Sequence, residues 1–134
     1  MIVVDTNVII YLHVTSTETA KAQLAFAKDP DWIVPSLWRS EFRNALVQYV
    51  THQVISINEA IHIALGAERL LSGNEYDVTS DKVLRLAVNS GCSAYDCEFV
   101  VLAQDLGVPL ITADKKVLRE FPNTAVSLDQ FLAS

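Results

Sequence analysis

Four isolated acidic residues, Asp5, Glu41, Asp96 and Asp114, stand beside apolar segments of this 134-residue chain. A carboxylate at the end of a buried strand loses water, and several that converge in a fold repel one another unless a cation neutralises them. Oxygen ligands without His or Cys are typical of Mg²⁺ or Mn²⁺ sites. The four acids therefore predict a metal-dependent enzyme.

Three of the four acids also have a purely structural explanation. Asp5 and Asp114 are each placed to cap a following helix, a role worth about 1 kcal/mol, and Asp96 falls three residues after Ser93, as in a capping box. Glu41 is harder to explain in this way, because helical periodicity places it at the margin of an apolar face. If the carboxylates converge, each close pair repels by roughly 1 to 4 kcal/mol in a partly wet site, which favours a shared cation.

Short apolar runs alternate with helical patterns along the chain. We expect strands over residues 2–5, 32–34, 75–78 and 108–112 and near residue 125. We expect helices over residues 6–13, 17–29, 36–52, 56–71, 81–89, 95–106 and 115–120, with a helical turn after residue 127. Ser36 is the predicted cap of the third helix.

Strands separated by helices predict an α/β fold with a parallel sheet covered on both faces, and we expect residues 1–134 to form a single domain. Ligands of such sheets bind beyond the carboxyl ends of the strands. Asp5 and Asp114 both follow strands, so we expect them at that edge.

Composition limits the classes of partner. Hydrophobic residues make up 51% of the chain and its mean hydropathy is +0.27, which favours self-association or a tight protein partner. A net charge of −6 argues against a protein that simply coats nucleic acid. It does not exclude a nuclease, because four basic residues are candidates for phosphate contacts: Arg39, Arg43, Lys115 and Lys116. No apolar stretch approaches the roughly 20 residues of a membrane span and no leader pattern precedes the first strand, so we expect a cytoplasmic protein.

The sulfur and imidazole groups favour no alternative chemistry. Cys92 and Cys97 have neither the spacing nor the His partners of a zinc site, and we expect two reduced, packed thiols. His13, His52 and His62 are scattered and form no known catalytic signature with Ser or acidic residues.

At four places the chain resembles the PIN-domain ribonucleases, in particular the VapC-type toxins of bacterial and archaeal toxin-antitoxin pairs. The matching motifs are V-D-T-N at residues 4–7, P-S-L-W-R-S-E at 35–41, S-A-Y-D at 93–96 and P-L-I-T-A-D at 109–114. The resemblance implies a PIN-like three-layer α/β/α fold with a central parallel sheet of four or five strands. It also implies that the four acids surround one or two Mg²⁺ or Mn²⁺ ions, with Thr6, Asn7, Ser93 and Thr112 at supporting polar positions.

The same resemblance implies partners. It predicts an RNA substrate, with tRNA as the family-based expectation, a homodimer, and a cognate antitoxin whose C-terminal segment occupies the cleft. Some relatives carry another acid shortly after the fourth, where this chain has Lys115 and Lys116. Because of that difference, binding of a second metal ion stays an open question, and contact of Lys115 and Lys116 with phosphate is favoured instead.

These inferences lead to a hypothesis of mechanism. Asp5, Asp96 and Asp114 would hold a divalent ion, directly or through water, and the chemistry that such an ion would supply is a water of lowered pKa for in-line attack on an RNA phosphodiester. Glu41 orients or deprotonates that water. The products would carry 5′-phosphate and 3′-hydroxyl ends.

Three other functions are weighed against this one. A receiver-like phosphoacceptor domain has a similar size and acidic site, but it needs an acceptor Asp near mid-chain. A haloacid-dehalogenase-like phosphatase would need an acid at position 7, which is Asn7. A catalytically silent PIN-fold interaction module stays open, because residue types alone cannot exclude it.

Overall fold

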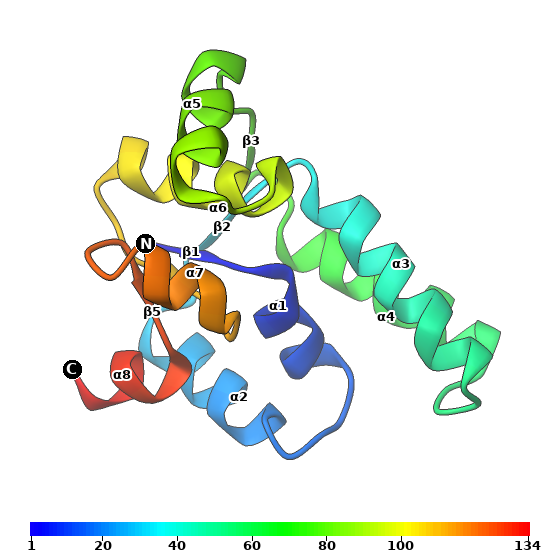
Figure 1. The fold of residues 1–134 in the computed structure, drawn as a ribbon. Coiled ribbons are helices and arrows are strands. Elements are labelled where there is room, and N and C mark those ends of the chain that lie inside the picture. The colour runs from blue at the N-terminus through cyan, green and yellow to red at the C-terminus, as the bar shows by residue number, and fades with distance from the viewer.

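Five short strands form one parallel sheet in the order β3-β2-β1-β4-β5 in the computed structural model, which describes residues 1–134 (Figure 1). The strands are β1 (Ile2–Val4), β2 (Trp32–Pro35), β3 (Glu75–Tyr76), β4 (Leu110–Ile111) and β5 (Ala125–Val126). Every residue of β1, β2 and β4 is buried, as expected of parallel strands that are covered on both faces.

Helices connect the strands and cover the sheet. They are α1 (Thr6–His13), α2 (Thr19–Lys28), α3 (Trp38–Thr51), α4 (Ile57–Leu70), α5 (Ser80–Ser90), α6 (Ala94–Leu106), α7 (Lys115–Glu120) and α8 (Leu128–Ala133). Helix α6 packs against β1, β2 and β4, with α5 outside it, while α1, α2 and α8 lie on the other side (Figure 1). Helices α3 and α4 form a hairpin that projects from the sheet. None of the helices combines the length and the apolar character needed to cross a bilayer.

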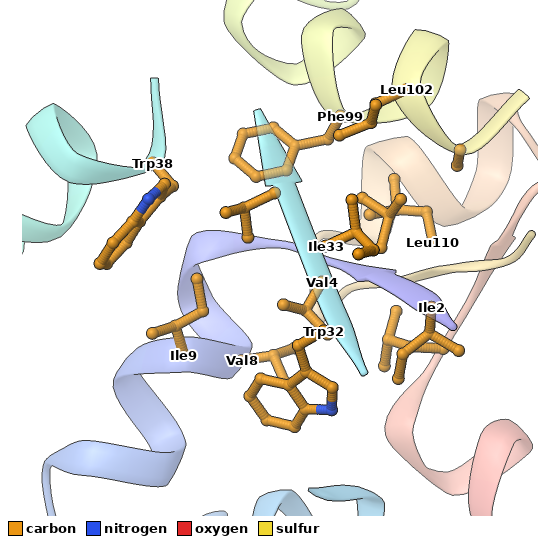
Figure 2. Close-up of a cluster of buried hydrophobic side chains, with 14 of the residues drawn as sticks. Ile2, Val4, Val8, Ile9, Trp32, Ile33, Trp38, Phe99, Leu102 and Leu110 are labelled. Carbon is orange, nitrogen blue, oxygen red and sulfur yellow. The ribbon is translucent and has the colours of Figure 1, made fainter. Parts of the chain in front are cut away.

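One cluster of 30 buried hydrophobic residues forms the core. Figure 2 shows Ile33 of β2 and Phe99 and Leu102 of α6 within it, with Val8 and Ile9 of α1 approaching from the other side. Trp32 packs edge-on against Phe26 of α2 with ring centroids 5.3 Å apart. These contacts hold α1, α2 and α6 against the sheet.

The sheet order places a topological switch point between β1 and β4. The chain moves outward from β1 through β2 to β3, and then returns to the other side of β1 to form β4 and β5. Val4 is paired with Ile111, so the next residues, Asp5 and Thr112, emerge side by side. Ligands of open parallel sheets bind at such a point, beyond the carboxyl ends of the strands.

Most helix ends follow local signals in the sequence. Ser56 and Glu59 form a reciprocal capping box at the start of α4, with both bonds at 3.1 Å. Helices α5 and α6 end at Gly91 and Gly107, whose φ angles of 74° and 66° are left-handed.

Several predicted boundaries were wrong. Ser36 does not cap a helix, because its N–H bonds the Tyr76 carbonyl in the sheet and its hydroxyl donates to Asp77. Helix α3 therefore begins two residues later, after Leu37, which makes no side-chain cap bond. Strand β4 is shorter than predicted, because the N–H of Val108 bonds the Ala103 carbonyl at the end of α6 instead of a neighbouring strand.

We predict that Leu110→Ala lowers the free energy of unfolding by about 2 to 5 kcal/mol. Leu110 is fully buried in β4, and truncation removes its contacts and leaves a cavity. Leu24→Ala on α2 is the control, because Leu24 is 59% exposed and its loss changes the free energy by no more than about 0.5 kcal/mol. Urea unfolding measures both variants, and equal effects would contradict the assigned core.

Candidate active site at the carboxyl edge of the sheet

Three polar residues, Asp5, Thr6 and Thr112, are the only polar or charged residues among the 35 buried residues of the protein. All three lie at the carboxyl ends of β1 and β4, at the switch point. Buried polar groups are tolerated when they are hydrogen-bonded to one another. The rest of the core is apolar, so this concentration marks the place where the fold is specialised.

The Asp5 carboxylate is held on both oxygens. Its Oδ1 accepts a bond from the Thr6 backbone N–H (2.8 Å), which makes Asp5 the cap of α1, and its Oδ2 accepts a bond from the Thr112 hydroxyl (2.7 Å). The capping role expected from the sequence is therefore real. It leaves each oxygen with further acceptor capacity toward the open edge.

Thr6 connects Asp5 to Glu41. Its backbone N–H bonds Asp5, and its hydroxyl donates to Glu41 Oε1 over 2.7 Å. Glu41 comes from the first turn of α3, 35 residues away in sequence. The sequence placed Glu41 at the margin of the apolar face of this helix. In the structure that margin faces Asp5 and Thr6 rather than solvent.

Thr112 connects Asp5 to Asp114 in the same manner. The Thr112 hydroxyl donates to Asp5 and accepts from the Asp114 backbone N–H (3.0 Å). Asp114 Oδ1 caps α7 by accepting bonds from the N–H groups of Lys116 and Val117, which leaves Oδ2 without a hydrogen bond. Asn7 accepts a longer bond from the Ala113 N–H (3.3 Å), so it ties the start of α1 to the loop after β4.

Asp96 approaches from a third element, the N-terminus of α6. Ser93 accepts a bond from the Asp96 backbone N–H (3.0 Å), but the reciprocal bond of a capping box is absent. The negative charge of Asp96 raises the pKa of both Asp5 and Glu41, so its carboxylate lies within electrostatic range of theirs. The structure therefore brings the four predicted acids to one edge.

Burial perturbs the protonation of these acids. Loss of water raises the pKa of Asp5 from 3.8 to about 6, and the charges of Glu41 and Asp96 act in the same direction. Burial is also the main cause that raises the pKa of Glu41 and of Asp96, and the Asp114 charge contributes to the latter. Carboxylic groups with raised pKa values gathered in one place are typical of functional sites.

Sequence reasoning missed two nearby acids. Burial and the neighbouring Asp77 raise the pKa of Glu98 on α6, and the charge of Glu98 raises that of Glu41. A signal was available for Glu98, because it interrupts the apolar residues of α6. The sequence contained no such signal for Asp77, because the position of this residue depends on the path of the chain after β3.

The four candidate phosphate contacts differ in their surroundings. Arg39 is held by Glu68 and Glu75, and Arg43 pairs with Glu68 over 3.2 Å. Lys116 donates to the Gly91 carbonyl over 2.7 Å. Lys115, directly after Asp114, is exposed and makes no hydrogen bond or ion pair, so it is the cation most available to an incoming anion.

The donor set fits a hydrated divalent cation. No three His, Cys, Asp or Glu side chains are arranged to ligate one ion directly, so the structure does not place the four predicted acids as direct ligands of one shared ion. Mg²⁺ commonly takes one or two carboxylates from a protein and keeps several waters. Hard oxygen ligands, one of them a desolvated carboxylate, suit such an ion.

A comparison with known sequence families decides the identity of this fold. The family described as PIN domain has a sequence pattern that matches residues 2–123 of this chain. The chain belongs to the PIN domain family. It is also similar to Ribonuclease VapC3 of Pyrobaculum aerophilum, with 25% identity over 127 residues that cover 90% of this chain and 95% of that relative.

Two solved structures resemble the chain in fold. PAE2754 from Pyrobaculum aerophilum superposes with a TM-score of 0.78 at 20% identity, covering 98% of this chain and 86% of that one. FitAcB from Neisseria gonorrhoeae gives 0.70 at 14% identity, covering 96% and 98%. The predicted PIN-like three-layer α/β/α fold with a parallel sheet of four or five strands is confirmed.

We predict that ionisation of Asp5 destabilises the metal-free PIN domain. Because the pKa of Asp5 is about 6 in the fold and 3.8 without it, the folded protein holds an extra proton between about pH 4 and about pH 6. Its free energy of unfolding therefore falls as pH rises through that window, by on the order of 3 kcal/mol.

Asp5→Asn removes this titration. In urea unfolding with EDTA, the variant should gain stability relative to the native protein as pH rises from 4 to 7. Parallel pH profiles for the two proteins would contradict the burial assigned to Asp5.

Proposed function

We propose that residues 1–134 act as one PIN domain with Mg²⁺-dependent endoribonuclease activity, and that the protein is the toxin of a toxin-antitoxin pair. The observation that carries the proposal is the hydrogen-bonded chain Glu41–Thr6–Asp5–Thr112–Asp114 at the switch point. Its three central residues, Asp5, Thr6 and Thr112, are the only buried polar or charged residues of the protein. Similarity to a relative named as a VapC ribonuclease supports the choice of RNA as substrate.

Asp5, Asp96 and Asp114 would hold one or two Mg²⁺ or Mn²⁺ ions, directly or through water. The chemistry that such an ion supplies is a water of lowered pKa and positive charge beside the phosphate. Asp5 and Asp114 have fixed positions because Thr112 bonds both. The threonines therefore orient the ligands as an outer shell does in other metal sites.

Glu41 would act as the base. Thr6 holds its Oε1, and burial raises its pKa, which makes the carboxylate a stronger proton acceptor than a solvated one. Attack by water leaves the ribose hydroxyl unused. The products would then carry a 5′-phosphate and a 3′-hydroxyl.

Lys115 would contact a phosphate next to the scissile bond, because its ammonium is uncommitted and exposed beside Asp114. Arg39, Arg43 and Lys116 are bound to protein groups in this structure and would contribute positive potential. A structured RNA such as tRNA is the substrate we expect from the family resemblance, and loop shape would contribute to its recognition.

We predict that Asp5→Asn, Glu41→Gln and Asp96→Asn each reduce RNA cleavage at least about 100-fold, and that EDTA abolishes it. Each change removes a carboxylate of the site without removing volume. Asp129→Asn is the matched control, because Asp129 pairs with Lys21 on the surface and is 74% exposed. End-labelled RNA with and without Mg²⁺ measures the rates and the end groups.

The same assay separates the alternatives. Full activity in all three site variants would refute the assignment, and a native chain without activity would favour the silent interaction module. A receiver-like domain is disfavoured by topology, since receiver sheets follow the order 2-1-3-4-5 and this sheet follows 3-2-1-4-5.

A cognate antitoxin and a second copy of the chain are the proposed partners, in the cytoplasm. An apolar groove of about 320 Å³ runs between α3 and α4, and none of the four acids lines it. Its lining residues are Arg43, Leu46, Val47, Val50, Thr51, Ile57, Ala60, Ile61 and Ala64. Exposed apolar residues on α5, Leu84 and Val88, support self-association.

We predict that Ile61→Asp weakens binding of the antitoxin encoded by the neighbouring gene by about tenfold or more. A charge in an apolar interface pocket commonly costs more than about 1 kcal/mol, and Ile61 is 52% exposed in the groove. Leu65→Asp is the control, because Leu65 is equally exposed on the same helix outside the groove. Titration calorimetry measures both affinities, and equal losses would contradict the groove as the antitoxin site.

A further inference from the structure

The first turn of α3, which carries Glu41, lacks the usual means of fixing a helix start. Its cap residue, Leu37, makes no side-chain bond, and the preceding Ser36 is used by the sheet and by Asp77. Helix starts without a capping side chain leave orphan N–H groups and fray. The placement of Glu41 therefore needs another anchor.

Glu75 on the edge strand β3 supplies three bonds to that turn. Its Oε2 accepts from the Trp38 indole N–H (2.8 Å) and from Arg39 Nε (2.7 Å), and its Oε1 accepts from Arg39 Nη2 (2.8 Å). The bidentate pairing with Arg39 fixes the direction of the guanidinium as well as its distance. A carboxylate at this end of α3 also complements the positive end of the helix dipole.

The residues that Glu75 binds are themselves packed tightly. The Trp38 side chain is fully buried, and its ring lies 5.5 Å from the ring of Phe42, which lies 5.9 Å from that of His13 on α1. Glu41 directly precedes Phe42 and lies one turn after Trp38 on the same helix. Glu75 itself is fixed because β3 pairs with the end of β2.

We propose that Glu75 is a positioning residue, which clamps Trp38 and Arg39 so that the Glu41 carboxylate stays bonded to Thr6. The inference rests on the proposed function for the catalytic role of Glu41. Displacement of a reacting group by about 1 Å can reduce a rate by about 100-fold, so a clamp outside the site can control the rate without touching substrate.

The test is Glu75→Gln, which keeps the shape of the side chain and removes one of the two carboxylates that pair with Arg39, leaving Glu68 as the other. We expect kcat for RNA cleavage to fall about tenfold or more, with KM changed by less than about threefold, because substrate contacts stay in place. Asp105→Asn is the matched control. It breaks the Lys82–Asp105 ion pair (2.7 Å) between α5 and α6, and its kcat should equal that of the native protein.

A crystal structure of the Glu75→Gln variant gives a readout that needs neither metal nor activity. The bond from the Thr6 hydroxyl to Glu41 should be broken in the variant. If that bond is intact, or if kcat matches that of the Asp105→Asn control, the proposal is overturned. A native protein that cleaves no RNA would refute the proposed function, while the crystal structure would still decide the clamp.

Trp38→Phe provides a second variant if Glu75→Gln does not fold. It removes one of the three bonds to Glu75 and keeps an aromatic ring in the core. We expect a fall in kcat of about threefold in this variant, again with little change in KM. An unchanged kcat in a folded Trp38→Phe protein would count against the clamp.

Discussion

The desolvated carboxylate of Asp5, between two parallel strands, is the constraint on which the rest of the structure depends. Its pKa is raised to about 6, so the fold must hold it with hydrogen bonds or neutralise it. The Thr6 backbone N–H and the Thr112 hydroxyl supply those bonds. The Thr6 hydroxyl also donates to Glu41, and the Thr112 hydroxyl also accepts from the Asp114 backbone N–H. One buried charge thus determines where the neighbouring acids stand.

The sequence predicted the parallel sheet, and it singled out four acids whose role in a site stays a prediction. Continuous β-branched runs identified β1 and β2, because strands covered on both faces have no polar alternation. Asp5 was identifiable because it follows such a run directly, and Glu41 because it is isolated at an apolar helix margin. Asp96 and Asp114 were found on weaker grounds, since each also has a capping role that the structure retains in part.

What the sequence could not provide are contacts that depend on register and on long-range packing. The bond from Thr112 to Asp5 exists because Val4 is paired with Ile111, and no local pattern fixes that pairing. Ser36 was predicted to cap a helix, but its backbone N–H bonds the carbonyl of Tyr76 in β3, a residue remote in sequence. Arg39 was predicted to contact phosphate because its ion-pair partner Glu75 is remote in sequence and could not be foreseen.

The late position of β4 in the chain has a consequence for protein synthesis. Thr112 is fixed in place by the bond from its N–H to the carbonyl of Val126 in β5, and both strands come after all of α1 to α6. A chain that is still growing on the ribosome can present Asp5, Glu41 and Asp96, but it has no β4 beside β1 to assemble them. Chemistry that depends on this edge of the sheet therefore requires that β4 and β5 have already been synthesised and paired.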